Sequence, residues 1–119
     1  MKKKVYYLAS CDTCKRIMNE VGVDKSFEQQ EIKSEPIRPD QLDEMKELAG
    51  SYELLFSRSA RKYSELGLDE KQLAESDYRS YILSEYTFLK RPVFIIGKRI
   101  FIGNSKTTIE HLKTALATS

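Results

Sequence analysis

The chain has 119 residues, of which 40% are hydrophobic and 32% charged, and its formal net charge is +2. This composition is typical of a globular protein, and so small a charge gives no reason to expect direct binding to nucleic acid. No segment approaches the roughly 18 apolar residues of a membrane span. The apolar segment Val5 to Ala9, after three lysines, is too short for a secretion signal. We therefore expect a single cytoplasmic domain over residues 1–119 that does not bind membranes.

The first part of the chain predicts a strand, a helix and a second strand. Residues 3–8 combine β-branched and aromatic side chains without glycine or proline, which favours a strand. From Cys14 onward, apolar side chains recur at helical spacing, and Gly22 is placed to end a helix over about residues 12–21. Residues 25–32 form a second, weaker strand pattern. This βαβ unit implies two parallel strands joined by a right-handed crossover.

The middle of the chain predicts helices. Residues 34–39 contain two prolines and form a turn, from which Pro39 can open a helix that ends at Gly50. The pattern of residues 52–89 is mainly helical. Within it Ser76-Asp77 can start a helix, and we interpret the aromatic stripe of that helix as core packing. We expect this region, about residues 36–89, to be a helical insertion within the single domain.

The last part of the chain predicts a hairpin and a helix. Two apolar runs, residues 93–96 and 99–103, are separated by Gly97-Lys98, which favours a β-hairpin with a primed turn. Asn104 and Ser105 then start a final helix. A βαβ half followed by a ββα half is the plan of thioredoxin and glutaredoxin. The predicted fold is therefore α/β and thioredoxin-like, with a four-stranded mixed sheet and a helical insertion.

Both cysteines lie in the turn between the first strand and the first helix, as Cys11 and Cys14. In a cytoplasmic protein this spacing indicates a redox-active or metal-binding pair rather than a structural disulfide. Cys11 is at a helix N-terminus, where free N–H groups and the helix dipole favour the thiolate. Cys14 is one turn further, on the apolar stripe. We predict that Cys11 is the exposed nucleophile and Cys14 the more buried, resolving thiol.

Two other interpretations of the cysteine pair stay open, namely two small core residues or two zinc ligands. A structural zinc site needs four ligands, and His111 is the only other residue of the usual cysteine and histidine types. We therefore predict no metal site. His111 lies beside Leu112 in the last helix and is interpreted as a surface or core-edge side chain.

The sequence resembles the ArsC/Spx family over nearly its whole length. This family includes glutaredoxin-coupled arsenate reductases, small YffB-type proteins and Spx redox regulators. The motifs that carry the resemblance are, in chain order, Val5-Tyr6-Tyr7-Leu8 with Ser10-Cys11-Asp12-Thr13-Cys14-Lys15, Ser57-Arg58-Ser59, Lys90-Arg91-Pro92 and Ile102-Gly103-Asn104.

The resemblance implies that Cys11 is the reactive cysteine. In arsenate reductases three arginines hold the oxyanion and stabilise the thiolate, and Arg58 and Arg91 match the first two. The proline that follows the second is kept cis in the family. The third arginine would fall near Ile102-Gly103-Asn104, and Arg99 is not at the matching position. A cysteine at the position of Cys14 is typical of Spx rather than of these reductases.

The resemblance implies a thiol-dependent oxidoreductase, in which Cys11 attacks an oxyanion or a disulfide. Arg58 and Arg91 would stabilise the thiolate and the anion, and Cys14 or glutathione would resolve the adduct. No bound cofactor is expected, and glutathione, a glutaredoxin or a thioredoxin would supply electrons. Simpler interpretations of the arginines also stay open: Arg58 can cap a helix C-terminus, and Arg91 can pair with a carboxylate of the insertion.

The alternative function is an Spx-like transcriptional regulator. Its switch would be a Cys11–Cys14 disulfide, and its partner would be the α subunit of RNA polymerase. Gly50 falls where Spx has a glycine at its contact surface with the polymerase, although YffB-type proteins have a similar glycine. Since the sequence has no long heptad pattern, we expect a monomer.

Overall fold

A computed structural model describes residues 2–118 of the chain. The chain forms two compact units, each described by itself below. Unit 1 contains the chain up to Glu35 and from Arg91 onward, and unit 2 is Pro36–Lys90. That residues 1–119 form a single domain stays a prediction. No helix in the described residues is long and apolar enough to cross a membrane.

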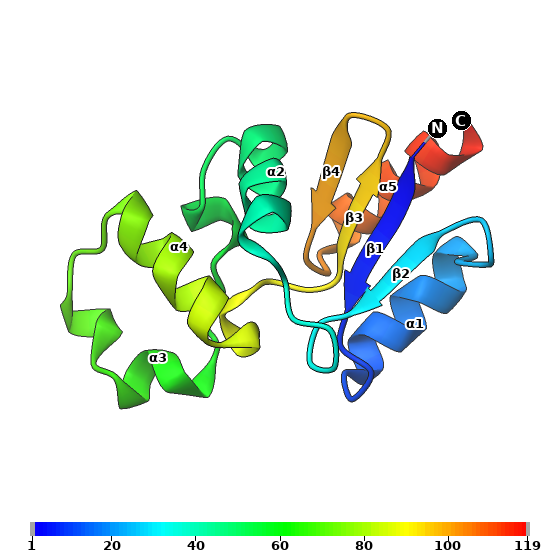
Figure 1. The fold of residues 1–119 in the computed structure, drawn as a ribbon. Coiled ribbons are helices and arrows are strands. Elements are labelled where there is room, and N and C mark those ends of the chain that lie inside the picture. The colour runs from blue at the N-terminus through cyan, green and yellow to red at the C-terminus, as the bar shows by residue number, and fades with distance from the viewer. Residues whose placement is uncertain (1, 119) are drawn as a thin grey trace. The chain divides into compact units, whose positions relative to one another are not determined.

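Unit 1 is a four-stranded mixed sheet with two helices, as predicted (Figure 1). The sheet order is β2-β1-β3-β4, in which β1 pairs in parallel with β2 and antiparallel with β3, and β3 pairs antiparallel with β4. The fold is therefore α/β and thioredoxin-like. The elements of unit 1 are β1 (Lys3–Tyr7), α1 (Asp12–Val21), β2 (Glu28–Glu31), β3 (Val93–Ile96), β4 (Arg99–Ile102) and α5 (Lys106–Ala117).

One face of the sheet carries a buried apolar cluster of unit 1. Val5 of β1 lies opposite Phe94 of β3, which in turn lies opposite Phe101 of β4, so the three side chains share a face. They pack with Ile17 of α1 and Leu112 of α5 in one buried cluster. Both helices therefore cover the same face, as the apolar spacing in each helix requires.

Unit 2 is helical, and aromatic rings form its centre. Phe56 stacks on Phe88 at 5.0 Å and meets Tyr78 edge-on at 4.9 Å, while Tyr81 meets Phe88 at 5.7 Å. The prediction that the aromatic stripe is core packing is confirmed. The elements are α2 (Pro39–Ala49), α3 (Arg61–Glu65), α4 (Glu75–Ser84) and the 3₁₀ turns η1 (Glu53–Leu55), η2 (Leu68–Glu70) and η3 (Tyr86–Phe88).

Two element boundaries differ from the prediction, and local hydrogen bonds explain both. The strand expected over residues 25–32 is only β2, because Asp24 forms a turn in which its side chain accepts from the N–H of Ser26 at 2.9 Å. The helix expected to start at Ser76 begins one residue earlier. Asp77 is inside its first turn, where its carboxylate accepts from the N–H of Ala74 at 2.8 Å.

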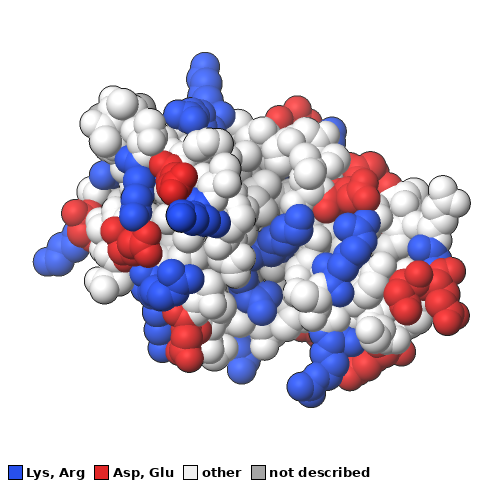
Figure 2. Space-filling model, turned by 180° about the vertical axis from the view of Figure 1, so that it is seen from behind, with Lys and Arg blue, Asp and Glu red and all other residues white. Residues whose placement is uncertain are grey.

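The hairpin and the last helix follow the predicted pattern. Gly97 has φ of 63°, the left-handed conformation that a primed turn requires at its first central position. Ser105 is the N-cap of α5, and its hydroxyl accepts from the N–H of Thr108 at 3.1 Å. Over most of the face seen in Figure 2, acidic and basic side chains are interspersed, in keeping with the net charge of +2.

Candidate redox site

The cysteine loop joins β1 to α1 and places Cys11 at the N-cap of α1. The N–H of Cys11 donates to the carbonyl oxygen of Leu8 at 3.0 Å, which closes a tight turn after β1. Cys11 has extended backbone angles, and its Sγ accepts from the N–H of Cys14 at 3.4 Å. The sulfur therefore occupies the place that a capping oxygen takes in other helices, among N–H groups that have no partner within the helix.

These surroundings stabilise the thiolate of Cys11. Burial alone would raise its pKa, but the N–H and the thiol of Cys14, the positive charge of Arg91 and the N–H of Thr13 outweigh that effect. The pKa of Cys11 is therefore held below its ordinary value of 9.0. Since Cys11 is also partly exposed, its sulfur is accessible to a reactant.

Cys14 has the opposite environment. Its side chain is 0% exposed, and burial raises the pKa of its thiol to about 12. The thiol and the negative charge of Cys11 add to this rise. Cys14 is the more buried of the two, as expected from its place on the apolar stripe, and it stays protonated at neutral pH.

Arg91 is in unit 1 with both cysteines, directly before β3. Its charge acts to lower the pKa of Cys11 and of Cys14. The bond between Arg91 and Pro92 is cis, as the resemblance implies, and the carbonyl oxygen of Pro92 accepts from the N–H of Gly103 at 2.9 Å. Arg91 is thus part of a loop that is fixed to the end of the hairpin.

Arg58 belongs to unit 2, and its contacts within that unit are specific. The guanidinium donates to the carboxylate of Glu53 at 2.8 Å and to the hydroxyl of Tyr78 at 3.0 Å. It also lies 5.7 Å from the ring centre of Tyr78. Arg58 pairs with these side chains rather than capping a helix C-terminus. Its role beside Cys11 stays a prediction.

Arg99 lies at the wrong end of the sheet to replace the third arginine. In the strand register, Lys3 is opposite Ile96, which is opposite Arg99. This row is at the start of β1, whereas Cys11 follows the end of β1. The Arg99 guanidinium instead lies 5.2 Å from the ring centre of Phe101.

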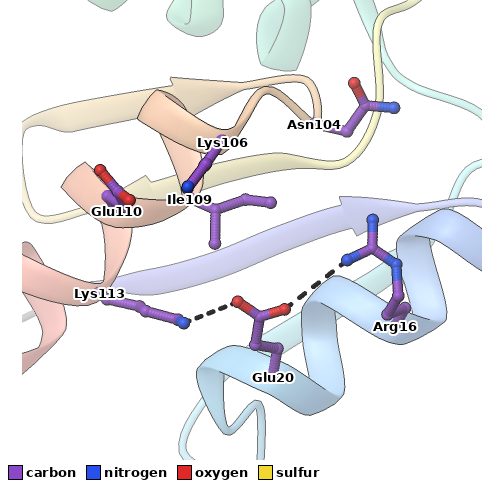
Figure 3. A pocket seen from close by; sticks show the side chains of 7 residues that line it. All are labelled: Arg16, Glu20, Asn104, Lys106, Ile109, Glu110 and Lys113. Carbon is purple, nitrogen blue, oxygen red and sulfur yellow. Dashed lines mark ion pairs between the residues drawn. The ribbon is translucent and has the colours of Figure 1, made fainter.

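Asn104, in the segment where the third arginine would fall, lines a pocket of about 290 Å³ between α1 and α5. Figure 3 shows Arg16 and Asn104 at one end of this pocket and Lys113 at the other. Glu20 pairs with Lys113 at 2.7 Å and with Arg16 at 3.7 Å. The pocket therefore has mixed charge, unlike a cluster of arginines. Its lining residues are Arg16, Glu20, Asn104, Lys106, Ile109, Glu110 and Lys113.

Glu31 contacts the cysteine loop, and the sequence analysis did not predict this contact. Its carboxylate accepts from the N–H of Ala9, in the cysteine loop, at 2.8 Å. The two residues are 22 positions apart, and a contact of this kind leaves no pattern in the sequence.

Two further sequence interpretations concern Gly50 and metal binding. Gly50 ends α2 with φ of 104°, and its N–H donates to the carbonyl oxygen of Lys46 at 2.7 Å. This left-handed conformation explains the glycine without a partner protein. Within residues 2–118 no group of three or more His, Cys, Asp and Glu side chains could hold a metal ion, and His111 is exposed.

A thioredoxin-like sheet with a cysteine of lowered thiol pKa at the N-cap of its first helix is an arrangement typical of thiol proteins. Within that class, the chain belongs to the ArsC family, whose model matches residues 6–112. No curated protein sequence matches the chain well enough to count as a relative.

Three of the solved structures that are similar to this chain cover nearly all of it. One is an arsenate reductase from Vibrio cholerae, with 13% identity, a TM-score of 0.78, and coverage of 94% of this chain and 98% of that one. A protein named YFFB has 20% identity, a TM-score of 0.77, and coverage of 97% and 99%. An arsenate reductase (ArsC) related protein from Brucella melitensis has 22% identity, a TM-score of 0.70, and coverage of 93% of each chain. At these identities the likeness shows the fold alone.

Proposed function

We propose that the protein is a thiol-dependent oxidoreductase in which Cys11 is the nucleophile. The observation that carries the proposal is the unequal pair of thiols. Cys11 is partly exposed and its pKa is lowered, whereas Cys14 is fully buried and its pKa is about 12. Family membership and the V. cholerae structure support arsenate as a substrate to test first.

With arsenate, the reaction has two steps. The Cys11 thiolate attacks arsenic, an oxygen leaves as water after it is protonated, and a sulfur–arsenic bond forms. A second thiolate then attacks the sulfur of Cys11. The sulfur–arsenic bond breaks with its electron pair on arsenic, so arsenic(V) becomes arsenic(III) and leaves as arsenite. The two thiols are oxidised to a disulfide, which a further reductant must reduce.

The environment of Cys14 favours an external thiol in the second step. Burial is the largest cause of the raised pKa of Cys14, and it remains after Cys11 has reacted. The thiolate of Cys14 is therefore scarce at neutral pH. The thiol of glutathione, or the exposed thiol of a glutaredoxin or thioredoxin, does not have its pKa raised by burial. We therefore propose one of these as the resolving thiol and reductant.

The arginines have distinct proposed roles. Arg91 stabilises the Cys11 thiolate through its charge. An arginine also offers a planar set of donors that matches the oxygens of an oxyanion. Arg58 supplies the second such group, and its pairing with Glu53 uses only part of the guanidinium.

The direct test is oxidation of glutathione that depends on arsenate, with and without glutaredoxin. We expect turnover with wild type and none with Cys11→Ser. Cys14→Ala is the matched control, because it leaves the N–H that caps Cys11 and should keep most of the turnover. No turnover of wild type in any condition would exclude arsenate, and a parallel assay with a glutathione mixed disulfide then tests the wider class.

The Spx-like regulator stays the alternative function. The conformation of Gly50 already accounts for that glycine, so the residue adds nothing in favour of a polymerase contact. A pull-down with the RNA polymerase α subunit under oxidising and reducing conditions tests this alternative. Capture only of the oxidised protein would support it.

A further inference from the structure

We propose that Glu31 is a positioning residue for Cys11, because its carboxylate fixes the cysteine loop to the turn that follows β2. The inference rests on the proposed role of Cys11 as the nucleophile. Its test, however, measures the thiol itself and needs no substrate.

The two oxygens of the Glu31 carboxylate have separate partners. Oε2 accepts from the N–H of Ala9 at 2.8 Å, in the loop between β1 and Cys11. Oε1 accepts from the N–H groups of Lys33 at 3.0 Å and Ser34 at 2.8 Å, and from the Ser34 hydroxyl at 3.0 Å. One side chain thus joins two loops that are far apart in the sequence.

The strand pairing places this carboxylate at the cysteine end of the sheet. Glu31 is the last residue of β2, and it lies opposite Tyr7, the last residue of β1. The N–H of Ile32 continues the pairing by donating to the carbonyl oxygen of Tyr7 at 2.9 Å. The side chain of Glu31 then reaches two residues beyond Tyr7, to Ala9, where the sheet ladder has ended.

A fixed loop matters because the capping geometry of Cys11 depends on it. Only Ala9 and Ser10 separate Leu8, whose carbonyl oxygen accepts from Cys11, from Cys11 itself. The contact between the Cys11 sulfur and the N–H of Cys14 is 3.4 Å long and weakens steeply if the loop shifts. Loss of that contact removes a cause of the lowered thiol pKa.

The Glu31 carboxylate stays charged under ordinary conditions. The N–H groups of Ala9 and Ser34 are the largest causes that hold the pKa of Glu31 below its usual value of 4.5. An ionised carboxylate is the strongest acceptor that a protein can place opposite backbone N–H groups. The same charge would by itself disfavour a thiolate nearby, so its presence beside the cysteine loop is useful only through positioning.

The test is the pH dependence of Cys11 alkylation by iodoacetamide, followed by mass spectrometry of the cysteine peptide. Glu31→Ala removes both oxygens of the carboxylate, so the N–H groups of Ala9 and Ser34 both lose their acceptor and the cysteine loop is released. We expect the Cys11 pKa to rise and alkylation at neutral pH to slow by about threefold or more, since one pKa unit is tenfold in thiolate.

The sign of the change separates positioning from charge. If Glu31 acted only through its charge, removing that charge would lower the Cys11 pKa and speed alkylation. An unchanged or lowered pKa in Glu31→Ala would therefore overturn the proposal. Glu28→Ala is the matched control, because it removes the same side chain and charge from the same strand, where Glu28 pairs with Lys4 instead. We expect no rise in the Cys11 pKa for Glu28→Ala.

Two further measurements keep the proposal testable if Glu31→Ala folds poorly. Ser34→Ala removes one donor to Oε1 and leaves the Ala9 contact, so the Cys11 pKa should stay that of wild type. In the wild-type protein, the Ala9 amide should be protected from hydrogen exchange. An Ala9 amide that exchanges as fast as in a free peptide would overturn the proposal without any variant.

Discussion

Cys11 and Cys14 are three residues apart, yet the pKa of the Cys11 thiol is lowered and that of the Cys14 thiol is raised. Cys11 lies at the N-cap, where N–H groups face its sulfur, and Cys14 lies inside the helix against the core. One turn of helix is enough to move a side chain from the first environment to the second. The unequal roles of the two residues therefore follow from helix geometry.

We predict that iodoacetamide alkylates Cys11 much faster than Cys14 at pH 7. With a pKa of about 12, Cys14 is a thiolate in only about one molecule in 100,000 at that pH. The rate for Cys11 should rise with pH and reach half of its maximum below pH 9, since its pKa is lowered from 9.0. Mass spectrometry of the two modified sites measures both rates, and equal rates would contradict the division of roles.

We also predict that Arg91→Gln raises the pKa of Cys11, because the charge of Arg91 favours the thiolate. Alkylation at neutral pH should slow by several-fold. Arg91→Lys keeps the charge, so it should retain more of the wild-type rate. The pH profile of alkylation tests this, and a profile unchanged in Arg91→Gln would show that the charge of Arg91 does not lower the pKa.

The sequence predicts this site only in part. The placement of Cys11 and Cys14 could be predicted because a cap and a helix face are local patterns. The hydrogen bonds from Glu31 to Ala9 and from Arg58 to Glu53 and Tyr78 could not, since side-chain contacts of this kind depend on the tertiary fold.

The helices and strands with strong end signals were predicted well. Gly22 is the C-cap of α1, and α2 starts at Pro39 with Gly50 as its C-cap, as the sequence indicated. The starts of β2 and α4 were misplaced, because Asp24 and Asp77 use their side chains to bond nearby backbone N–H groups. Such bonds compete with regular structure and shift its boundaries by a few residues.

At α5, we predict that Ser105→Ala lowers the free energy of unfolding by about 1 kcal/mol. The Ser105 hydroxyl accepts from the N–H of Thr108, and alanine leaves that donor without a partner. Thr107→Ala, at an exposed position of the same helix, is the control and should change stability little. Urea unfolding followed by circular dichroism measures both, and equal effects would show that the cap is not responsible.

Each unit contains a cluster of buried apolar side chains. The core of unit 1 joins the sheet to α1 and α5, and that of unit 2 is built on Phe56 and Phe88. The sequence predicted the sheet, its helices and the helical middle, because hydrophobic periodicity is strong in each. It carried no signal for how the aromatic rings of unit 2 pair.

We predict that Phe94→Ala lowers the free energy of unfolding by about 3–5 kcal/mol. Phe94 is 1% exposed in the unit 1 core and meets Phe27 edge-on at 6.2 Å. If residues 1–119 are one domain, the Ser57 amide of unit 2, which donates to Phe88, should lose protection from hydrogen exchange as well. Protection of Ser57 that is unchanged in Phe94→Ala would mean that the units unfold independently.

The two connections between the units lie close in sequence to residues that contact the cysteine loop or change the pKa of Cys11. The chain leaves unit 1 after Glu35, just beyond the turn that Glu31 holds, and returns at Arg91, whose charge acts on Cys11. The first connection thus begins shortly after Glu31, the positioning residue proposed for Cys11, and the second ends at Arg91. Tension on either end of Pro36–Lys90 would reach the turn held by Glu31, or Arg91, through the backbone before it reached a strand.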